Sequence, residues 1–183
     1  MKKAVGVALA MTLALTGCTN YVEDGTSQLE TGSYTEAIAT FEKAVEKEQG
    51  VAEAYRGIGL ANYELEKYEE AKSALDSAIE NGGEATPTLY NIMGICDMKM
   101  ENYASALNNF NMGISLAEGT QENESEDSKA DYTEVKQEME FNMVVCYEKQ
   151  FDWANAKAKM VDYISKYPDD AAAQKEAQFL ETR

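Results

Sequence analysis

The sequence predicts an all-α solenoid of about four stacked helix-turn-helix repeats that ends in a capping helix. Two observations predict it. A composite motif recurs at intervals near 34 residues, and the apolar residues around it are spaced three and four apart, as on amphipathic helices. The copies are GSYTEAIATFEKAVE (32–46), EKYEEAKSALDSAIE (66–80), ENYASALNNFNMGIS (101–115) and a weaker FDWANAKAKMVDYIS (151–165). Their aligned alanines are Ala37, Ala71, Ala106 and Ala156, at spacings of 34, 35 and 50.

The first segment of the chain, residues 1–17, has the features of a signal peptide. Lys2 and Lys3 form a basic head, and residues 4–15 are an uncharged apolar run that is too short to span a bilayer. The LTGC that follows resembles the lipobox of bacterial lipoproteins, which implies a diacylglyceryl thioether on Cys18 and cleavage just before it. The alternative is an ordinary signal peptide with a coincidental cysteine. We expect a lipid anchor that holds the chain on the extracytoplasmic face of the cell membrane.

The repeat domain is expected to follow, over residues 18–168. In the second and third copies, the motif is preceded by AYRGIGLANYEL (54–65) and LYNIMGICDMKM (89–100), each with helical spacing of apolar residues. Each repeat should therefore be a pair of antiparallel helices. The expected repeats span about 18–50, 51–84, 87–118 and 137–168.

These repeats resemble the tetratricopeptide repeat (TPR) family, and the resemblance implies a right-handed superhelix. Gly25, Gly59 and Gly94 match its small contact positions, together with the aligned alanines. The aromatic positions are matched by Tyr21, Tyr34, Tyr55, Tyr68, Tyr90, Tyr103 and Trp153, and the bulky position of the second helix by Phe41, Leu75, Phe110 and Met160. Copy one departs from the pattern at Asp24 and Gln28, and copy four at Glu140 and Val144. The alternative is an unrelated helical bundle.

Two further segments complete the expected layout. The acidic insertion 119–134 accounts for the long third spacing and predicts a mobile loop. Its Asn123, Ser125, Asp127, Asp131 and Glu134 fall at ligand places of an EF-hand window, but Ser128 stands where that loop needs glycine, which favours a solvated loop over a calcium site. Residues 169–183 predict a capping helix with a polar outer face.

Composition excludes several classes of function. The net charge of −17 becomes −19 once Lys2 and Lys3 are removed with residues 1–17, and it opposes nucleic-acid binding. There is no histidine to act as a general base or metal ligand. Cys96 and Cys146 are interpreted as small buried apolar residues rather than as a disulfide or a reactive thiol. No carboxylate pair or phosphate loop is singled out, so we expect no enzyme, no metal and no cofactor.

The TPR resemblance implies a concave channel, lined by the first helix of each repeat, that holds a protein or peptide partner. The residues carried over to it are Arg56, Leu60, Tyr63, Asn91, Ile95, Met98, Lys99, Phe141, Val145 and Lys149. An apolar floor with a basic rim suits an apolar or amphipathic segment with acidic flanks; the alternative is that the apolar row is buried by neighbouring repeats and binds nothing. The expected function is a membrane-anchored adaptor or scaffold in an envelope-assembly or secretion complex. A small-molecule-binding or hydrolytic lipoprotein is the alternative.

Overall fold

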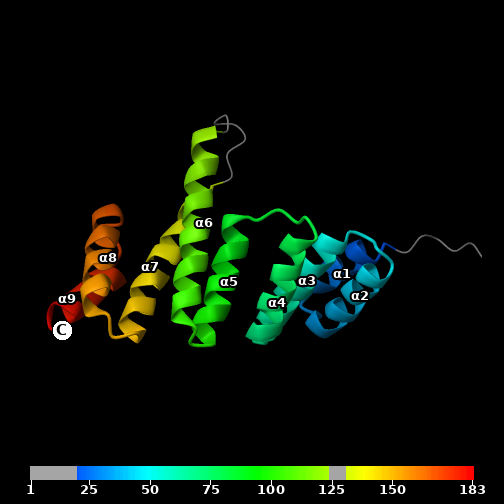
Figure 1. The fold of residues 1–183 in the computed structure, drawn as a ribbon, viewed down its shortest axis with the longest axis horizontal. Coiled ribbons are helices and arrows are strands. Elements are labelled where there is room, and N and C mark those ends of the chain that lie inside the picture. The colour runs from blue at the N-terminus through cyan, green and yellow to red at the C-terminus, as the bar shows by residue number, and fades with distance from the viewer. Residues whose placement is uncertain (1–19, 124–130) are drawn as a thin grey trace, which may run out of the picture.

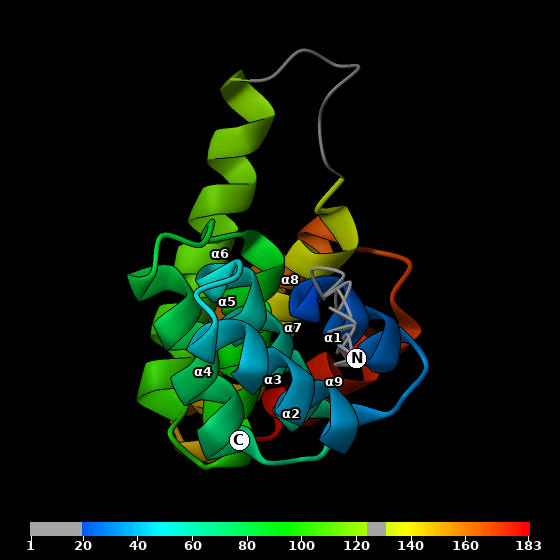
Figure 2. The ribbon, with the colours of Figure 1, turned by 90° about the vertical axis from the view of Figure 1, so that its right-hand side faces the viewer.

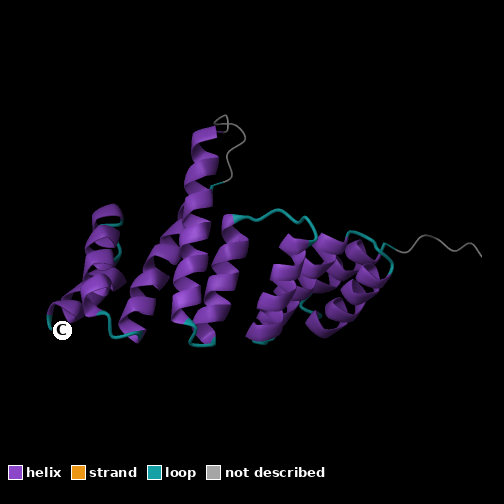
Figure 3. Cartoon of the chain, viewed as in Figure 1, coloured by secondary structure: helices purple, strands orange, loops and turns teal. Residues whose placement is uncertain are grey.

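The computed structural model describes residues 20–123 and 131–183, and all regular elements in these ranges are α-helices (Figure 3). They are α1 (Tyr21–Glu30), α2 (Tyr34–Glu46), α3 (Val51–Glu64), α4 (Tyr68–Glu80), α5 (Pro87–Lys99), α6 (Tyr103–Asn123), α7 (Thr133–Lys149), α8 (Trp153–Lys166) and α9 (Ala171–Glu181). Four antiparallel hairpins follow one another along the molecule, and α9 closes the C-terminal end (Figure 1). The predicted all-α solenoid is confirmed. The predicted signal peptide and Cys18 lie outside the described residues.

Each hairpin is closed by small residues where its two helices cross. The aligned alanines of the second helices, Ala37, Ala71, Ala106 and Ala156, are all fully buried. The glycines of the first helices lie against the bulky residue that follows them sixteen positions later. A Cβ atom on Gly25 would lie 2.8 Å from the ring of Phe41, and one on Gly59 would lie 2.6 Å from Leu75. Glycine at these positions is therefore required by packing.

The fourth hairpin uses a different pair at the same two positions. Its first helix has Val144 where the other hairpins have glycine, and its second helix has Met160 where two of them have phenylalanine. Both residues are buried in one cluster with Ala156 and Tyr163. A larger residue on one helix thus faces a more slender, flexible one on the other, which keeps the total volume similar.

The apolar core is a series of clusters along the solenoid. One joins the first hairpin to α3, one joins α4 to α5, one joins α5, α6 and α7, and one joins α7, α8 and α9. Seen along the molecule, the helix pairs lie behind one another, and the end of α6 projects beyond the stack (Figure 2). Each repeat therefore covers the apolar side of its neighbour, as expected of a solenoid.

The junction between the second and third hairpins is the least extensive one in the stack. Contacts between α4 and α5 are sparser than those that join α2 to α3 or α6 to α7. The connecting segment, residues 81–86, contains Gly82 in the left-handed region (φ 86°) and runs as a loop from the end of α4 to the start of α5 (Figure 1). Leu75, Leu89 and Met93 form the small cluster that bridges this junction.

Helices extend into the segment that the sequence assigned to an acidic loop. Helix α6 continues to Asn123, and α7 begins at Thr133 rather than at residue 137. An ion pair of 2.7 Å between Lys136 and Glu118 joins the two helices. The window compared with an EF-hand loop is described only at its ends, because residues 124–130 lie outside the described ranges. Within those ranges, no helix is long and apolar enough to cross a membrane.

Candidate peptide-binding groove

The sequence-predicted groove residues lie on the first helices of three successive hairpins. Helix α3 carries Arg56, Leu60 and Tyr63; α5 carries Asn91, Ile95, Met98 and Lys99; and α7 carries Phe141, Val145 and Lys149. We call the succession of α3, α5 and α7 the row. Helix α5 contacts α7, whereas α3 and α5 lie on the two sides of the junction between the second and third hairpins and share no extensive contact. Residues three and four apart share one side of a helix, so each helix presents its members of the set as one stripe.

The apolar members of the set are half-buried rather than exposed. Leu60, Ile95 and Val145 all fall in this intermediate range. Ile95 packs against the cluster that joins α5, α6 and α7, and Phe141 packs against the cluster that joins α7, α8 and α9. These two side chains therefore stabilise the contacts between repeats and also present their outer atoms along the row.

The three expected cations differ in their surroundings. The Arg56 side chain is half-buried, and its Nη2 donates a hydrogen bond of 3.0 Å to the backbone oxygen of Glu84 in the linker between α4 and α5. Its Nε is buried without a hydrogen-bond partner among the described residues. Lys99 and Lys149 are exposed. Arg56 thus holds the linker in place, and the two lysines are the cations available at the surface.

A polar bridge crosses from α5 to α7 in the middle of the row. The side chain of Asn91 is buried, and its Nδ2 donates a hydrogen bond of 2.7 Å to Glu138 Oε2. Its Oδ1 is buried and accepts no hydrogen bond from the described part of the chain. A buried amide oxygen without a donor is unfavourable.

A hollow of about 300 Å³ lies beside this bridge, between α7 and the start of α9. Its lining residues are Glu134, Gln137, Glu138, Phe141, Asn142, Tyr163, Asp170 and Ala172. The rings of Phe141 and Tyr163 meet edge to face, with centroids 5.5 Å apart. The hollow combines an aromatic wall with carboxylates and amides, which suits an extended segment that has both apolar and hydrogen-bonding groups.

Hydrogen bonds fix the wall of this hollow. Gln137 Nε2 donates to the Tyr163 hydroxyl (2.9 Å), which in turn donates to Asp170 Oδ2 (2.8 Å). Asp170 also accepts from the backbone N–H groups of Ala172 and Ala173 at 3.0 Å, which caps α9. These donors lower the pKa of Asp170, with the Ala173 N–H as the largest cause. Burial, more than any neighbour, raises the pKa of Tyr163. The hydroxyl therefore stays neutral and the carboxylate ionised near neutral pH.

Sequence reasoning missed the acidic side of the groove. Glu134 and Glu138 share a face of α7 with Phe141 and Val145, because these residues are three or four apart. Extending the helix upstream from Phe141 would have found both, but the expected repeat began at residue 137 and left Glu134 in the insertion. The surface at α7 is consequently more acidic than the sequence predicted, because the predicted rim consisted of the cations Arg56, Lys99 and Lys149.

The cysteines and the acidic side chains of the described residues were the other candidates for a reactive or metal-binding site. Cys96 and Cys146 are free and buried, and burial is the main cause that raises the pKa of each thiol to about 12. Thiols with such pKa values are poor nucleophiles near neutral pH. No group of three or more cysteine, aspartate or glutamate side chains within the described ranges is arranged to hold a metal ion.

Comparisons with known proteins agree with this architecture. A model of the tetratricopeptide repeat family matches residues 139–170. No curated protein matches the chain in sequence. Among solved structures, the chain is similar to YrrB, described as a TPR protein with an unusual peptide-binding site, with a TM-score of 0.70 and 21% identity over 88% of this chain and 75% of that one. It is also similar to an ArsTM double mutant of MamA RS-1, with a TM-score of 0.69 and 14% identity over 89% and 82% of the two chains.

Proposed function

The chain is a tetratricopeptide-repeat protein in its fold, and on that premise we propose that it is a protein-binding adaptor that holds a partner segment along α3, α5 and α7. The observation that carries the proposal is the half-buried apolar row of Leu60, Ile95 and Val145 on three successive first helices, together with the hollow walled by Phe141 and Tyr163. A preformed row needs little reordering on binding, which favours affinity.

The partner segment would place apolar side chains on the half-buried row of Leu60, Ile95 and Val145. Near α7, Glu134 and Glu138 favour a donor-rich or basic stretch, whereas Lys99 and Lys149 favour an acidic one. The proposed partner therefore carries charges of both signs around an apolar centre, in place of the purely acidic flanks suggested by the sequence.

A photo-crosslinking experiment tests the groove. A photoreactive residue at Tyr63 or Phe141 should trap a defined protein in membranes that contain the full chain, whereas one at Val161, which is 62% exposed on α8, should not. The pair Leu60→Glu and Ile95→Glu should abolish the crosslink and leave the circular-dichroism spectrum of a helical fold. Equal trapping from all three positions, or trapping unaffected by the double substitution, would refute the proposal.

We place the adaptor on the extracytoplasmic face of a bacterial membrane, tethered through lipid on Cys18 and working in an envelope-assembly or secretion complex. This part of the proposal rests on the LTGC motif after a basic and apolar leader. Mass spectrometry of the mature N-terminus tests it: a diacylglyceryl group on Cys18 is expected, and Cys18→Ala should release the chain from the membrane. An unmodified cysteine in a membrane-free chain would contradict the anchor.

An enzyme or small-molecule-binding lipoprotein is the alternative from another class. Nothing in the described residues favours it, because the carboxylates of the groove have no nucleophile or metal cluster beside them. Turnover of a small molecule by purified, partner-free protein, lost on Glu138→Gln, would favour that alternative over the adaptor.

A further inference from the structure

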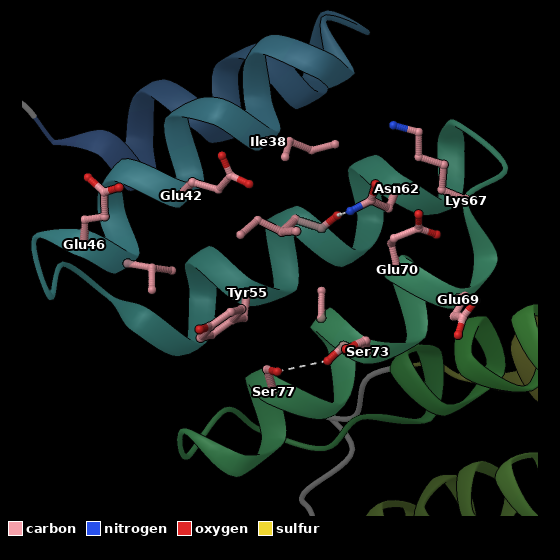
Figure 4. Close-up of a pocket in the computed structure, with 13 residues that line it drawn as sticks. Ile38, Glu42, Glu46, Tyr55, Asn62, Lys67, Glu69, Glu70, Ser73 and Ser77 are labelled. Atoms are coloured by element: carbon pink, nitrogen blue, oxygen red, sulfur yellow. Dashed lines mark hydrogen bonds between the residues drawn. The ribbon is translucent and has the colours of Figure 1, made fainter.

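A second and larger hollow, of about 940 Å³, lies between α2, α3 and α4 (Figure 4). We call it the outer hollow. Its lining residues are Ile38, Glu42, Val45, Glu46, Tyr55, Ile58, Asn62, Lys67, Glu69, Glu70, Ser73, Ala74 and Ser77. Helix α3 forms its floor, and α2 and α4 form its two walls (Figure 4).

The outer hollow and the groove use different sides of α3. The groove residues on this helix are Arg56, Leu60 and Tyr63, whereas Tyr55, Ile58 and Asn62 line the outer hollow. At about 100° per residue, the two stripes lie about 130° apart around the helix axis. A ligand in the outer hollow would therefore leave the groove free, so this surface is separate from the one in the proposed function.

The floor and the rim of the outer hollow differ in chemistry. Ile38, Val45 and Ile58 are half-buried and Ala74 is buried, which gives an apolar strip between the walls. Asn62 is 6% exposed, and its Nδ2 donates to the backbone oxygen of Ile58 at 3.0 Å, so its amide is held in place. Partly exposed apolar strips of this kind mark binding surfaces when polar groups surround them.

The rim is almost entirely acidic. Glu42 and Glu46 are exposed on α2, and Glu69 and Glu70 are exposed at the start of α4. Lys67 is the one cation that lines the outer hollow among the described residues. None of the four carboxylates takes part in an ion pair within the described ranges. Their charges therefore remain available to a ligand.

We propose that the outer hollow docks a cationic amphipathic helix from a protein partner. Its apolar stripe would cover Ile38, Val45, Ile58 and Ala74, and lysine or arginine on both flanks would face the four glutamates. The floor from Tyr55 to Asn62 covers about two turns of α3, so a partner helix of about three turns spans it and extends slightly beyond its ends. An acidic partner is disfavoured by the same four charges.

A designed helical peptide of about 12 residues tests the proposal, with leucines on one face and lysines on its flanks. Fluorescence anisotropy at about 0.15 M salt should show saturable binding to the mature protein. A scrambled peptide of identical composition, which lacks the stripe, and a version with glutamates in place of lysines should both bind at least about tenfold more weakly.

Matched variants separate docking from general attraction to an acidic protein. Glu42→Lys with Glu70→Lys should weaken the peptide about tenfold or more. Glu30→Lys with Glu80→Lys makes the same change in net charge at exposed sites outside the outer hollow and should have little effect. Ser73→Trp, at an exposed position on the wall, should block binding while leaving the helical circular-dichroism spectrum intact.

Three results would overturn the proposal. They are equal weakening by the two charge-reversal pairs, equal affinity for the scrambled peptide, and binding that survives Ser73→Trp. Sedimentation that shows a dimer dissolved by Glu42→Lys with Glu70→Lys would assign the outer hollow to a second copy of the chain instead. Leu60→Glu with Ile95→Glu should leave the peptide affinity unchanged, so failure of the groove and failure of the outer hollow are distinguishable.

Discussion

At the scale of single residues, the fold depends on pairs of positions that share a fixed volume. Gly25 faces Phe41, Gly59 faces Leu75, Gly94 faces Phe110, and Val144 lies in one cluster with Met160. In the first three pairs the bulky side chain leaves no room for a Cβ atom at the glycine position. The fourth pair shows that the volume can be divided differently between the two helices.

Gly94→Val should therefore be strongly destabilising, because its side chain would overlap the Phe110 ring. We expect a loss of about 1–3 kcal/mol of unfolding free energy, measured by urea denaturation. Adding Phe110→Met recreates the Val144–Met160 combination and should recover part of the loss. Gly119→Ala is the control, since no atom lies within 4 Å of its Cβ. A double variant no more stable than Gly94→Val alone would contradict the shared-volume argument.

A second residue-scale feature makes the C-terminal end sensitive to pH. Glu148 on α7 is half-buried next to Glu176 on α9, and burial, followed by the Glu176 charge, raises the pKa of Glu148 to about 7. Its ordinary value is 4.5. Because the folded state favours the protonated form of Glu148, the stability linked to this carboxyl is fully present below about pH 4.5. It is lost as the pH rises through 7 and the half-buried carboxyl ionises.

Glu176→Gln should raise the melting temperature at about pH 8 and have much less effect at about pH 4, because Glu148 is ionised only at the higher pH. We expect a gain of about 1 kcal/mol or less, since water screens a pair that is this exposed. Glu181→Gln removes an exposed charge from the same helix and is the control. An increase in melting temperature that is equal at both pH values would contradict the assignment.

At the scale of elements, every hairpin turns through one residue in the left-handed region. These residues are Gly32, Glu66, Glu101 and Phe151, with φ between 59° and 76°. The turn after α3 has both bonds of a Schellman motif, from Lys67 N–H to Asn62 O (2.9 Å) and from Glu66 N–H to Tyr63 O (2.9 Å). Only the first hairpin has the glycine that this conformation favours.

Glu66→Gly and Glu101→Gly should each stabilise the protein by about 0.5–1 kcal/mol, because glycine adopts positive φ without a Cβ clash. Thermal and urea unfolding measure the gain. The control Glu69→Gly, at an exposed helical position on α4, should cost a similar amount instead. A loss of stability at positions 66 and 101 would mean that these glutamates contribute more through contacts than they cost in strain.

At the scale of the whole molecule, stability is local because the core is a series of clusters. The cluster that joins α7, α8 and α9 shares no buried residue with the cluster of the first hairpin, and the junction between α4 and α5 is the least extensive in the stack. In such an array each repeat is stabilised by its neighbours only. Damage at one end should therefore stay at that end.

Leu180→Ala tests this locality. Leu180, on α9, is 1% exposed in the cluster that joins α7, α8 and α9. Removing its side chain should lower the unfolding free energy by about 2–5 kcal/mol. Amide hydrogen exchange should accelerate in α7, α8 and α9 and remain unchanged in α1 to α4. Phe179→Ala, at a residue 41% exposed on the same helix, is the control. Faster exchange throughout the chain would show one cooperative unit instead.

Much of this organisation could be predicted from the amino-acid sequence. The 34-residue period, the aligned alanines and the pairing of each glycine with a bulky residue sixteen positions later indicate helical hairpins stacked in series, because each depends on local spacing and on volume at fixed offsets. The candidate site was predicted only in outline. The helices that carry it follow from the repeat, but the hydrogen bond of Arg56 to the linker and the bridge of Asn91 to Glu138 join segments 28 and 47 residues apart.

The sequence by itself determined what repeats: the helices, their turns and the faces they bury, since these follow from periodicities of three to four residues and of one repeat. Tertiary structure alone decided the bridge from Asn91 to Glu138, the less extensive junction between α4 and α5, and the outer hollow. Each of these depends on how far apart successive hairpins sit and which side chains converge between them, and no spacing along one helix encodes that separation.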